Sequence, residues 1–104
     1  MHELPHTRSC FVCGEANPLG LRLRFESDGA IVRARFTPRP EHNGFKGVVH
    51  GGITATVLDE IMVWARATRT LKFAFGAEMN ERYLNPITPG RAIILTGEMT
   101  ADRK

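Results

Sequence analysis

The feature that most constrains this chain is a long apolar stretch over residues 53–69. It contains no glycine or proline, and its apolar residues fall around most of the circumference of a helix. A helix that is apolar nearly all round is buried. The stretch therefore predicts a central helix with other elements packed around it.

Two segments of alternating apolar and polar residues come before this helix. They are 21–26 and 31–36, and such alternation is typical of a half-buried strand. A Ser-Asp-Gly sequence at 27–29 separates them, and Asp-Gly is a strong signal for a hairpin turn. We therefore expect an antiparallel hairpin.

A tight hairpin turn would bring arginines together on the polar face of these strands. Arg24 would lie near Arg33, and Arg22 near Arg35. Like charges placed opposite each other destabilise a sheet slightly. This face is therefore either simply solvated or covered by an anion, such as a carboxylate of the protein or a ligand phosphate.

The rest of the chain completes an α+β layout. Residues 78–84 and 91–99 are expected to form strands on either side of a turn at 85–90, and residues 1–20 an irregular lead-in. Antiparallel hairpins on both sides of one helix predict a sheet wrapped around that helix. At 104 residues, we expect a single domain over 1–104.

Composition and charge exclude several classes of protein. The chain is 42% hydrophobic and 24% charged, which excludes a disordered or collagen-like protein. No apolar run approaches the roughly 18 residues of a membrane span. The N-terminus has no apolar signal core, so we expect a cytoplasmic protein. The arginines behind the net charge of +3 are spread along the chain, which argues against a nucleic-acid partner.

The two cysteines, Cys10 and Cys13, have Cys-x-x-Cys spacing. Without a secretory signal a structural disulfide is disfavoured, and a redox motif would need a thioredoxin-like βαβ context. We favour two reduced structural cysteines and expect no metal. The main alternative is a zinc site in which His2 and His6 complete the set of four ligands.

An acidic residue, Asp59, lies in the middle of the predicted apolar helix, and its presence there requires an explanation. A carboxylate is costly to bury without a partner, and Asp is a poor helix former. An ion pair with Arg66 or with a strand arginine would be purely structural. The alternative is a general base or nucleophile in a cleft, with its pKa tuned by burial.

The sequence His50-Gly51-Gly52 stands where the helix begins. The first amides of a helix have no partner within the helix and, helped by the helix dipole, can hold a developing oxyanion. Two glycines let a substrate carbonyl approach the backbone without a side chain in the way. Together with Asp59, this helix start is a candidate catalytic site.

The helix itself separates these two features. Gly51 and Asp59 are eight residues apart, which is about 12 Å of helix. One carbonyl cannot contact both on the same helix. A two-fold dimer with antiparallel helices side by side would bring Gly51 of one chain to Asp59 of the other. We therefore expect a homodimer, alone or as a dimer of dimers, with two composite sites.

These motifs resemble the hotdog-fold acyl-CoA thioesterases of the PaaI type. The resemblance rests on Asn-Gly-Phe-Lys-Gly-Val-Val-His-Gly-Gly at 43–52, followed by Asp59. Tyr-Leu-Asn-Pro at 83–86, Pro-Gly at 89–90 and Cys-Phe-Val-Cys-Gly at 10–14 are similar to further parts of that family. It implies a hotdog fold, an antiparallel sheet curled around a long central helix, and hydrolysis of acyl-CoA thioesters.

The resemblance also implies roles for individual residues. Asp59 would be the general base or nucleophile, and the Gly51 amide would polarise the thioester carbonyl. Gly52 and His50 would shape that turn, and Asn43 is the candidate to help bind the carbonyl. No metal or redox cofactor is implied, because CoA is part of the substrate.

Three other functions stay open from the sequence. The same fold could bind or sense acyl-CoA without turnover, or form a structural oligomer with Asp59 in an ion pair. A hydratase or dehydratase would need a histidine and an acid close together, and His50 and Asp59 are nine residues apart. We also expect about two more strands after residue 99 in a hotdog sheet, so the chain is either truncated or has a shortened sheet that leans on a partner.

Overall fold

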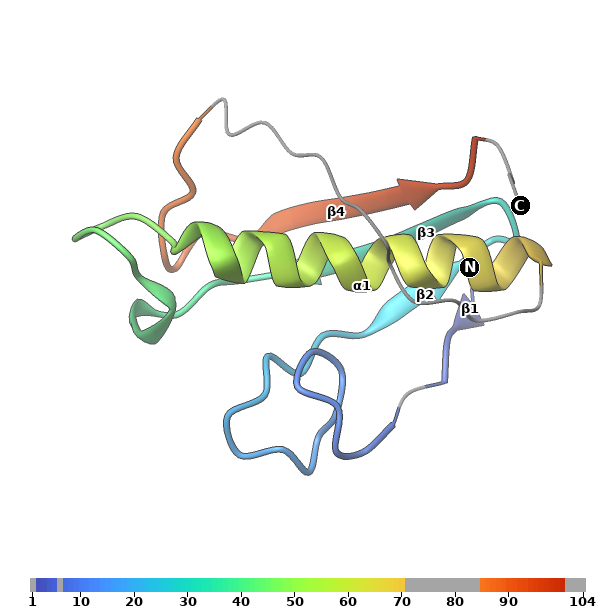
Figure 1. The fold of residues 1–104 in the computed structure, drawn as a ribbon, viewed down its shortest axis with the longest axis horizontal. Coiled ribbons are helices and arrows are strands. Elements are labelled where there is room, and N and C mark those ends of the chain that lie inside the picture. Colours follow the sequence, from blue (N-terminus) through green and yellow to red (C-terminus); the bar gives the residue numbers. More distant parts are fainter. Residues whose placement is uncertain (1, 6, 71–84, 101–104) are drawn as a thin grey trace.

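The computed structural model describes residues 2–5, 7–70 and 85–100, with one antiparallel sheet packed against one long helix (Figure 1). The strands are β1 (His2–Glu3), β2 (Phe25–Ser27), β3 (Ile31–Phe36) and β4 (Ile93–Glu98), hydrogen-bonded in the order β1-β2-β3-β4. A short 3-10 helix, η1 (Pro40–His42), precedes the long helix α1 (Gly51–Thr70). This is the α+β layout that the sequence predicts.

The hairpin of β2 and β3 forms as predicted, but its register differs from that of a tight turn. Glu26, and not Arg24, lies opposite Arg33. The reason is Asp28, whose Oδ1 accepts the backbone N–H groups of the two residues that follow Gly29, at 2.9 and 2.8 Å. This side chain stabilises a longer loop. The predicted facing of Arg24 and Arg33 is therefore wrong.

Arg24 pairs instead with acidic residues of the lead-in. Its guanidinium nitrogens lie 3.4 Å from a carboxylate oxygen of Glu3 and 3.6 Å from one of Glu15. It also donates a hydrogen bond to the Cys13 carbonyl at 2.6 Å. Arg22 lies outside β2 with a φ of 55°, so it does not face Arg35 across the hairpin as predicted. Carboxylates of the protein itself therefore neutralise Arg24.

The lead-in is not wholly irregular, which differs from the sequence prediction. His2 and Glu3 form β1 and lie opposite Ser27 and Glu26 of β2. A two-residue strand is too short to show an alternating pattern, so the sequence carries no signal for it. Further along the lead-in, Val12 is buried in the core.

The core lies between α1 and one face of the sheet. Along β3, Val32, Ala34 and Phe36 point into it, as the alternating pattern predicts. Val57 and Ile61 of α1 meet them and are 0% and 1% exposed. Burial of side chains this size supplies most of the stability of a small domain.

Helix α1 buries one face and leaves the other open. Met62, on the open face, is 46% exposed. Burial all round the helix, which the sequence predicts, is therefore wrong for a single copy of the chain. The reason is that, among the residues that the structure describes, the sheet lies on one side of α1 (Figure 1). The buried residues of α1 are Val57, Ile61, Trp64, Ala65 and Ala67.

The strand predicted over 91–99 is confirmed as β4, which pairs with β3 from Ile31 opposite Glu98 to Phe36 opposite Ile93. The strand predicted over 78–84 lies outside the described residues. Within the described part of the chain, no helix is long and apolar enough to cross a membrane.

Removal of the Ile61 side chain tests how far the fold depends on α1 packing against the sheet. We expect Ile61→Ala to lower the free energy of unfolding by about 2–5 kcal/mol, because it leaves a cavity in a closed core. Ile94→Ala is the matched control, because Ile94 is 59% exposed on β4, and we expect it to cost less than about 1 kcal/mol. Urea unfolding measures both. Equal losses would show that α1 does not depend on this contact.

Candidate active site at the start of the central helix

Helix α1 begins at a cap made by His50. The His50 carbonyl accepts the backbone N–H groups of Ile53 and Thr54 at 3.0 and 3.2 Å, and its Nδ1 accepts the N–H of Gly52 at 2.8 Å. A side chain that accepts an N–H from the first turn acts as an N-cap. Because Nδ1 is the acceptor, this bonding assigns the ring proton to Nε2 in a neutral tautomer.

Two glycines make room for the His50 ring. A Cβ on Gly52 would stand 3.0 Å from its Nδ1, and a Cβ on Gly44 would stand 3.3 Å from its Cδ2. Both distances are tighter than ordinary van der Waals contact. The ring therefore fits because neither residue has a side chain, which gives a packing reason for Gly52 in the turn.

Backbone hydrogen bonds fasten the loop before α1 to its surroundings. The His50 N–H donates to the His42 carbonyl at 2.7 Å, and the Val49 N–H donates to the Ile87 carbonyl at 2.8 Å. Asn43 forms an isolated antiparallel bridge with Val49. The segment that precedes α1 therefore lies beside the segment that leads into β4.

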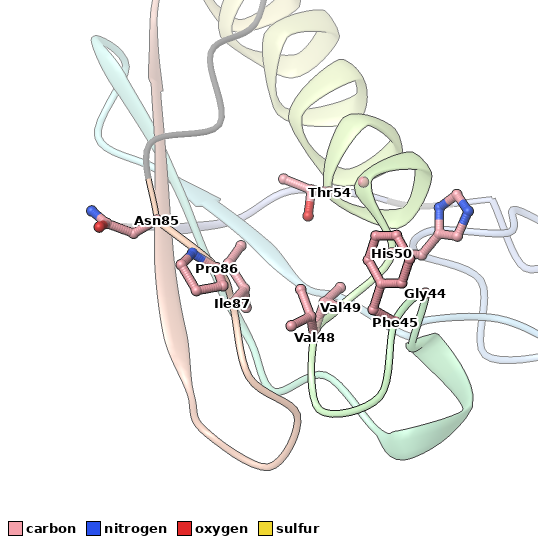
Figure 2. Close-up of a pocket in the computed structure, with 10 residues that line it drawn as sticks. Gly44, Phe45, Val48, Val49, His50, Thr54, Asn85, Pro86 and Ile87 are labelled. Atoms are coloured by element: carbon pink, nitrogen blue, oxygen red, sulfur yellow. The ribbon is translucent and has the colours of Figure 1, made fainter.

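A cavity of about 610 Å³ opens at this end of α1 (Figure 2). Its walls come from the loop before α1, the first turn of α1 and the segment 85–87. Its size is that of a small-molecule site. The lining residues are Gly44, Phe45, Val48, Val49, His50, Gly51, Thr54, Asn85, Pro86 and Ile87.

The candidate residues do not all meet at this cavity. His50 and Gly51 line it, and Gly52 contacts the His50 ring from the first turn of α1. Asn43 does not line it. The Asn43 Oδ1 atom is buried and has no hydrogen-bond partner within the described part of the chain.

Asp59 lies on the open face of α1, away from the cavity. Its side chain is exposed, so the cost of burial inferred from the sequence does not arise in a single copy of the chain. Asp59 is absent from the cavity lining. This agrees with the separation of about 12 Å along the helix from Gly51.

Glu60 points to a different side of α1. It is half-buried, it accepts a hydrogen bond from Trp64, and the Cys13 sulfur lies 3.8 Å from its Oε2. Burial raises the pKa of the Glu60 carboxyl, and the Asp59 charge adds to the effect. The two adjacent acids therefore have different surroundings, as an offset of about 100° round a helix predicts.

His42 is a buried support beneath the loop and lies outside the cavity lining. Its ring packs against Phe36 with centroids 5.7 Å apart, and its Nδ1 accepts the Arg39 backbone N–H at 2.9 Å. Burial lowers the pKa of His42, and the Arg39 charge lowers it further. The sequence reading did not single out this residue.

Comparison with known proteins identifies the family. The thioesterase superfamily model matches residues 46–101. One crystallised thioesterase superfamily protein is 34% identical with a TM-score of 0.82, over 92% of this chain and 50% of that chain. Thioesterase superfamily member 2 from Mus musculus is 24% identical with a TM-score of 0.71, over 81% of this chain and 63% of that chain. Comparison with curated proteins gives no significant match.

The chain belongs to the thioesterase superfamily, and its sheet and long helix form the hotdog fold. The fold and family predicted from the sequence are confirmed. The chain spans half the length of the first of the two solved structures. The PaaI-type assignment stays a prediction.

Several cavity residues were missed by the sequence reasoning. Phe45 and Val48 lie in the motif at 43–52, but their residue types do not distinguish a residue that lines a cavity from one in an ordinary loop. In the sequence, the segment 85–87 is a turn signal that partly overlaps the family resemblance at 83–86, and Thr54 is part of an apolar helix. The proline at position 86 marked a turn without showing what that turn would cover.

The His50 cap can be tested by two substitutions. We expect His50→Ala to lower the free energy of unfolding by about 1 kcal/mol, because the Gly52 N–H loses its acceptor. His50→Asn keeps a short acceptor that is favoured at N-caps, so it should retain most of the stability. Thermal and urea unfolding measure the difference. If the two variants lose the same stability, the ring does not act as a cap.

The lowered pKa of His42 predicts an acid-dependent loss of stability. In the unfolded chain His42 binds a proton below about pH 6.5, whereas in the fold it stays neutral to lower pH. The contribution of the neutral His42 side chain to the free energy of unfolding is therefore fully present above about pH 6.5. It is lost as the pH falls toward the pKa of His42 in the folded protein. Urea unfolding across this range measures it. His42→Asn keeps an acceptor for Arg39 but does not titrate, so its stability should fall less steeply; an unchanged slope would contradict the assignment.

Proposed function

We propose that this protein hydrolyses acyl-CoA thioesters to a free acid and CoA, at two composite sites in a homodimer or a dimer of dimers. One observation carries the proposal. In a chain of the thioesterase superfamily, a cavity opens at the N-terminus of the long helix and is lined by His50 and Gly51. This is the place that the PaaI-type resemblance gives to the thioester carbonyl.

The chemistry of the helix start suits a developing oxyanion. Gly51 is the first residue of α1, where backbone N–H groups and the helix dipole favour negative charge. The Gly52 N–H is bonded to His50. Following the PaaI-type resemblance, we assign the Gly51 N–H to the carbonyl oxygen. The apolar residues Phe45, Val48 and Ile87 in the cavity lining suit an acyl chain.

Asp59 acts from the other copy of the chain in this proposal. The exposure of Asp59 on the open face of α1 supports this role, because that face is accessible to a second protomer. Antiparallel packing of two α1 helices would place Asp59 of one protomer at the start of α1 of the other.

The reaction itself is a simple acyl transfer to water. The Asp59 carboxylate either takes a proton from a water that adds to the thioester carbon, or adds to that carbon directly to give an anhydride that water then cleaves. In both routes the C–S bond breaks, the CoA sulfur takes up a proton and the acid is released. No cofactor is needed in either route, because CoA is part of the substrate.

Loss of the Asp59 carboxylate tests the catalytic role. We expect Asp59→Asn to reduce turnover by at least about 100-fold, because the amide can neither accept the water proton nor attack. The measurement is release of free thiol from short, long and aromatic acyl-CoAs. Glu26→Gln is the matched control, because Glu26 is exposed on β2 and distant in sequence from the site. Substrate binding without turnover by the unmodified protein would instead indicate a binding module.

A mixed-dimer experiment tests whether the sites are composite. Gly51→Pro removes the assigned N–H and is tolerated at the first position of a helix. A heterodimer of Gly51→Pro with Asp59→Asn has one intact composite site. Random mixing of the two inactive variants should therefore restore about a quarter of the unmodified activity. No recovery in dimers shown to have exchanged subunits would mean that each site lies within one protomer.

A further inference from the structure

Two cysteines and an acid gather where the lead-in meets α1, and none of them lines the cavity of the proposed thioesterase site. They are Cys10, Cys13 and Glu60, and one ligand atom from each lies within 4.8 Å of the other two. Cys13 is buried, and Cys10 and Glu60 are half-buried. Thiolate sulfur and carboxylate oxygen are both ligands that zinc accepts in proteins.

The backbone of the lead-in holds the two sulfurs together. A tight turn forms in which the Gly14 N–H donates to the Cys10 carbonyl at 2.9 Å and the Cys13 N–H lies 3.5 Å from the Cys10 sulfur. A Cβ on Gly14 would stand 2.3 Å from the Arg8 carbonyl oxygen, so only glycine fits there. An amide that donates to sulfur stabilises its ionised form, the form that binds a metal.

Other groups around the cluster also favour a bound cation. Cys13 is buried and Cys10 and Glu60 are half-buried, so a negative charge at these donors has little compensation from solvent. A divalent cation would supply that compensation. Trp64 donates a hydrogen bond to Glu60 and fixes its orientation, as outer partners of metal ligands do.

We propose that Cys10, Cys13 and Glu60 bind a zinc ion that fastens the lead-in to the central helix. A tetrahedral site with Zn–S and Zn–O bonds of about 2.3 and 2.1 Å puts sulfur and oxygen ligands about 3.6 Å apart. The Cys13 sulfur and the Glu60 Oε2 are 3.8 Å apart. Binding displaces the thiol protons, and both sulfurs enter as thiolates.

A cavity of about 320 Å³ adjoins the cluster, and the three ligands line it together with Val63 and Trp64. It has room for a water molecule as the fourth ligand. The ligand set therefore differs from the alternative drawn from the sequence, because the third ligand is Glu60 from α1. His2 lies in β1 and is not part of the cluster. His6 lies outside the described residues.

The test uses the 104-residue chain, purified under reducing conditions and titrated with Co²⁺ as a spectroscopic substitute for Zn²⁺. We expect one equivalent of Co²⁺ to give a thiolate-to-cobalt charge-transfer band and the visible bands of a four-coordinate ion, both removed by Zn²⁺. Saturation with Zn²⁺ should also raise the melting temperature. No charge-transfer band, or a Cys10–Cys13 disulfide in the protein after reduction, would overturn the proposal.

Variants then assign the ligands. We expect Cys10→Ser and Cys13→Ser to abolish the charge-transfer band, and Glu60→Gln to weaken Co²⁺ binding by at least about tenfold while keeping that band. Asp59→Asn is the matched control for Glu60, because it removes the neighbouring acid from the open face of the helix and should bind Co²⁺ normally. Circular dichroism confirms that each variant is folded. Unchanged affinity in Glu60→Gln, or equal loss in Asp59→Asn, would overturn the assignment of Glu60 as a ligand.

Discussion

The packing of α1 on the sheet is the interaction on which the rest of the structure depends. Val57 and Ile61 are buried against β3 and β4, and this contact fixes both the height of the helix above the sheet and its rotation. The rotation of α1 about its axis determines which side chains lie on each side of the helix. One side meets the sheet, one faces the lead-in with Glu60, and the open face carries Asp59. Three chemical environments therefore follow from one apolar contact.

The sequence is most informative where a periodic pattern spans many residues. The helix was predicted over 53–69 and lies at Gly51–Thr70, and the strand over 91–99 lies at Ile93–Glu98. The hairpin register was not predictable in the same way, since a single side chain, Asp28, sets the length of its loop. Alternation of apolar and polar residues determines which face of the sheet a side chain lies on. It does not determine which residue of the neighbouring strand lies opposite.

The same difference separates the site residues that the sequence could place from those that it could not. His50 and Gly51 could be placed at the cavity from the sequence because they adjoin an element that the sequence defines well. The opposite wall at 85–87 and the buried position of His42 depend on tertiary contacts that leave no local pattern. An apolar helix predicts a buried Asp59, but in a single copy of the chain Asp59 is exposed on the open face of α1. The grouping of Glu60 with Cys10 and Cys13 likewise joins parts of the chain that no spacing rule connects.

The hydrogen bond between the Val49 N–H and the Ile87 carbonyl has a consequence for the order of folding. It joins positions on the order of 40 residues apart, and closing a loop of that length costs roughly 3 kcal/mol of chain entropy. The hairpin and the helix close much shorter loops, so they can form before this contact is made. The two walls of the cavity therefore meet after the hairpin and the helix have formed. Pairing of β4 with β3 closes a still longer loop, between Phe36 and Ile93, so the cavity forms together with that strand pairing and is lost together with it.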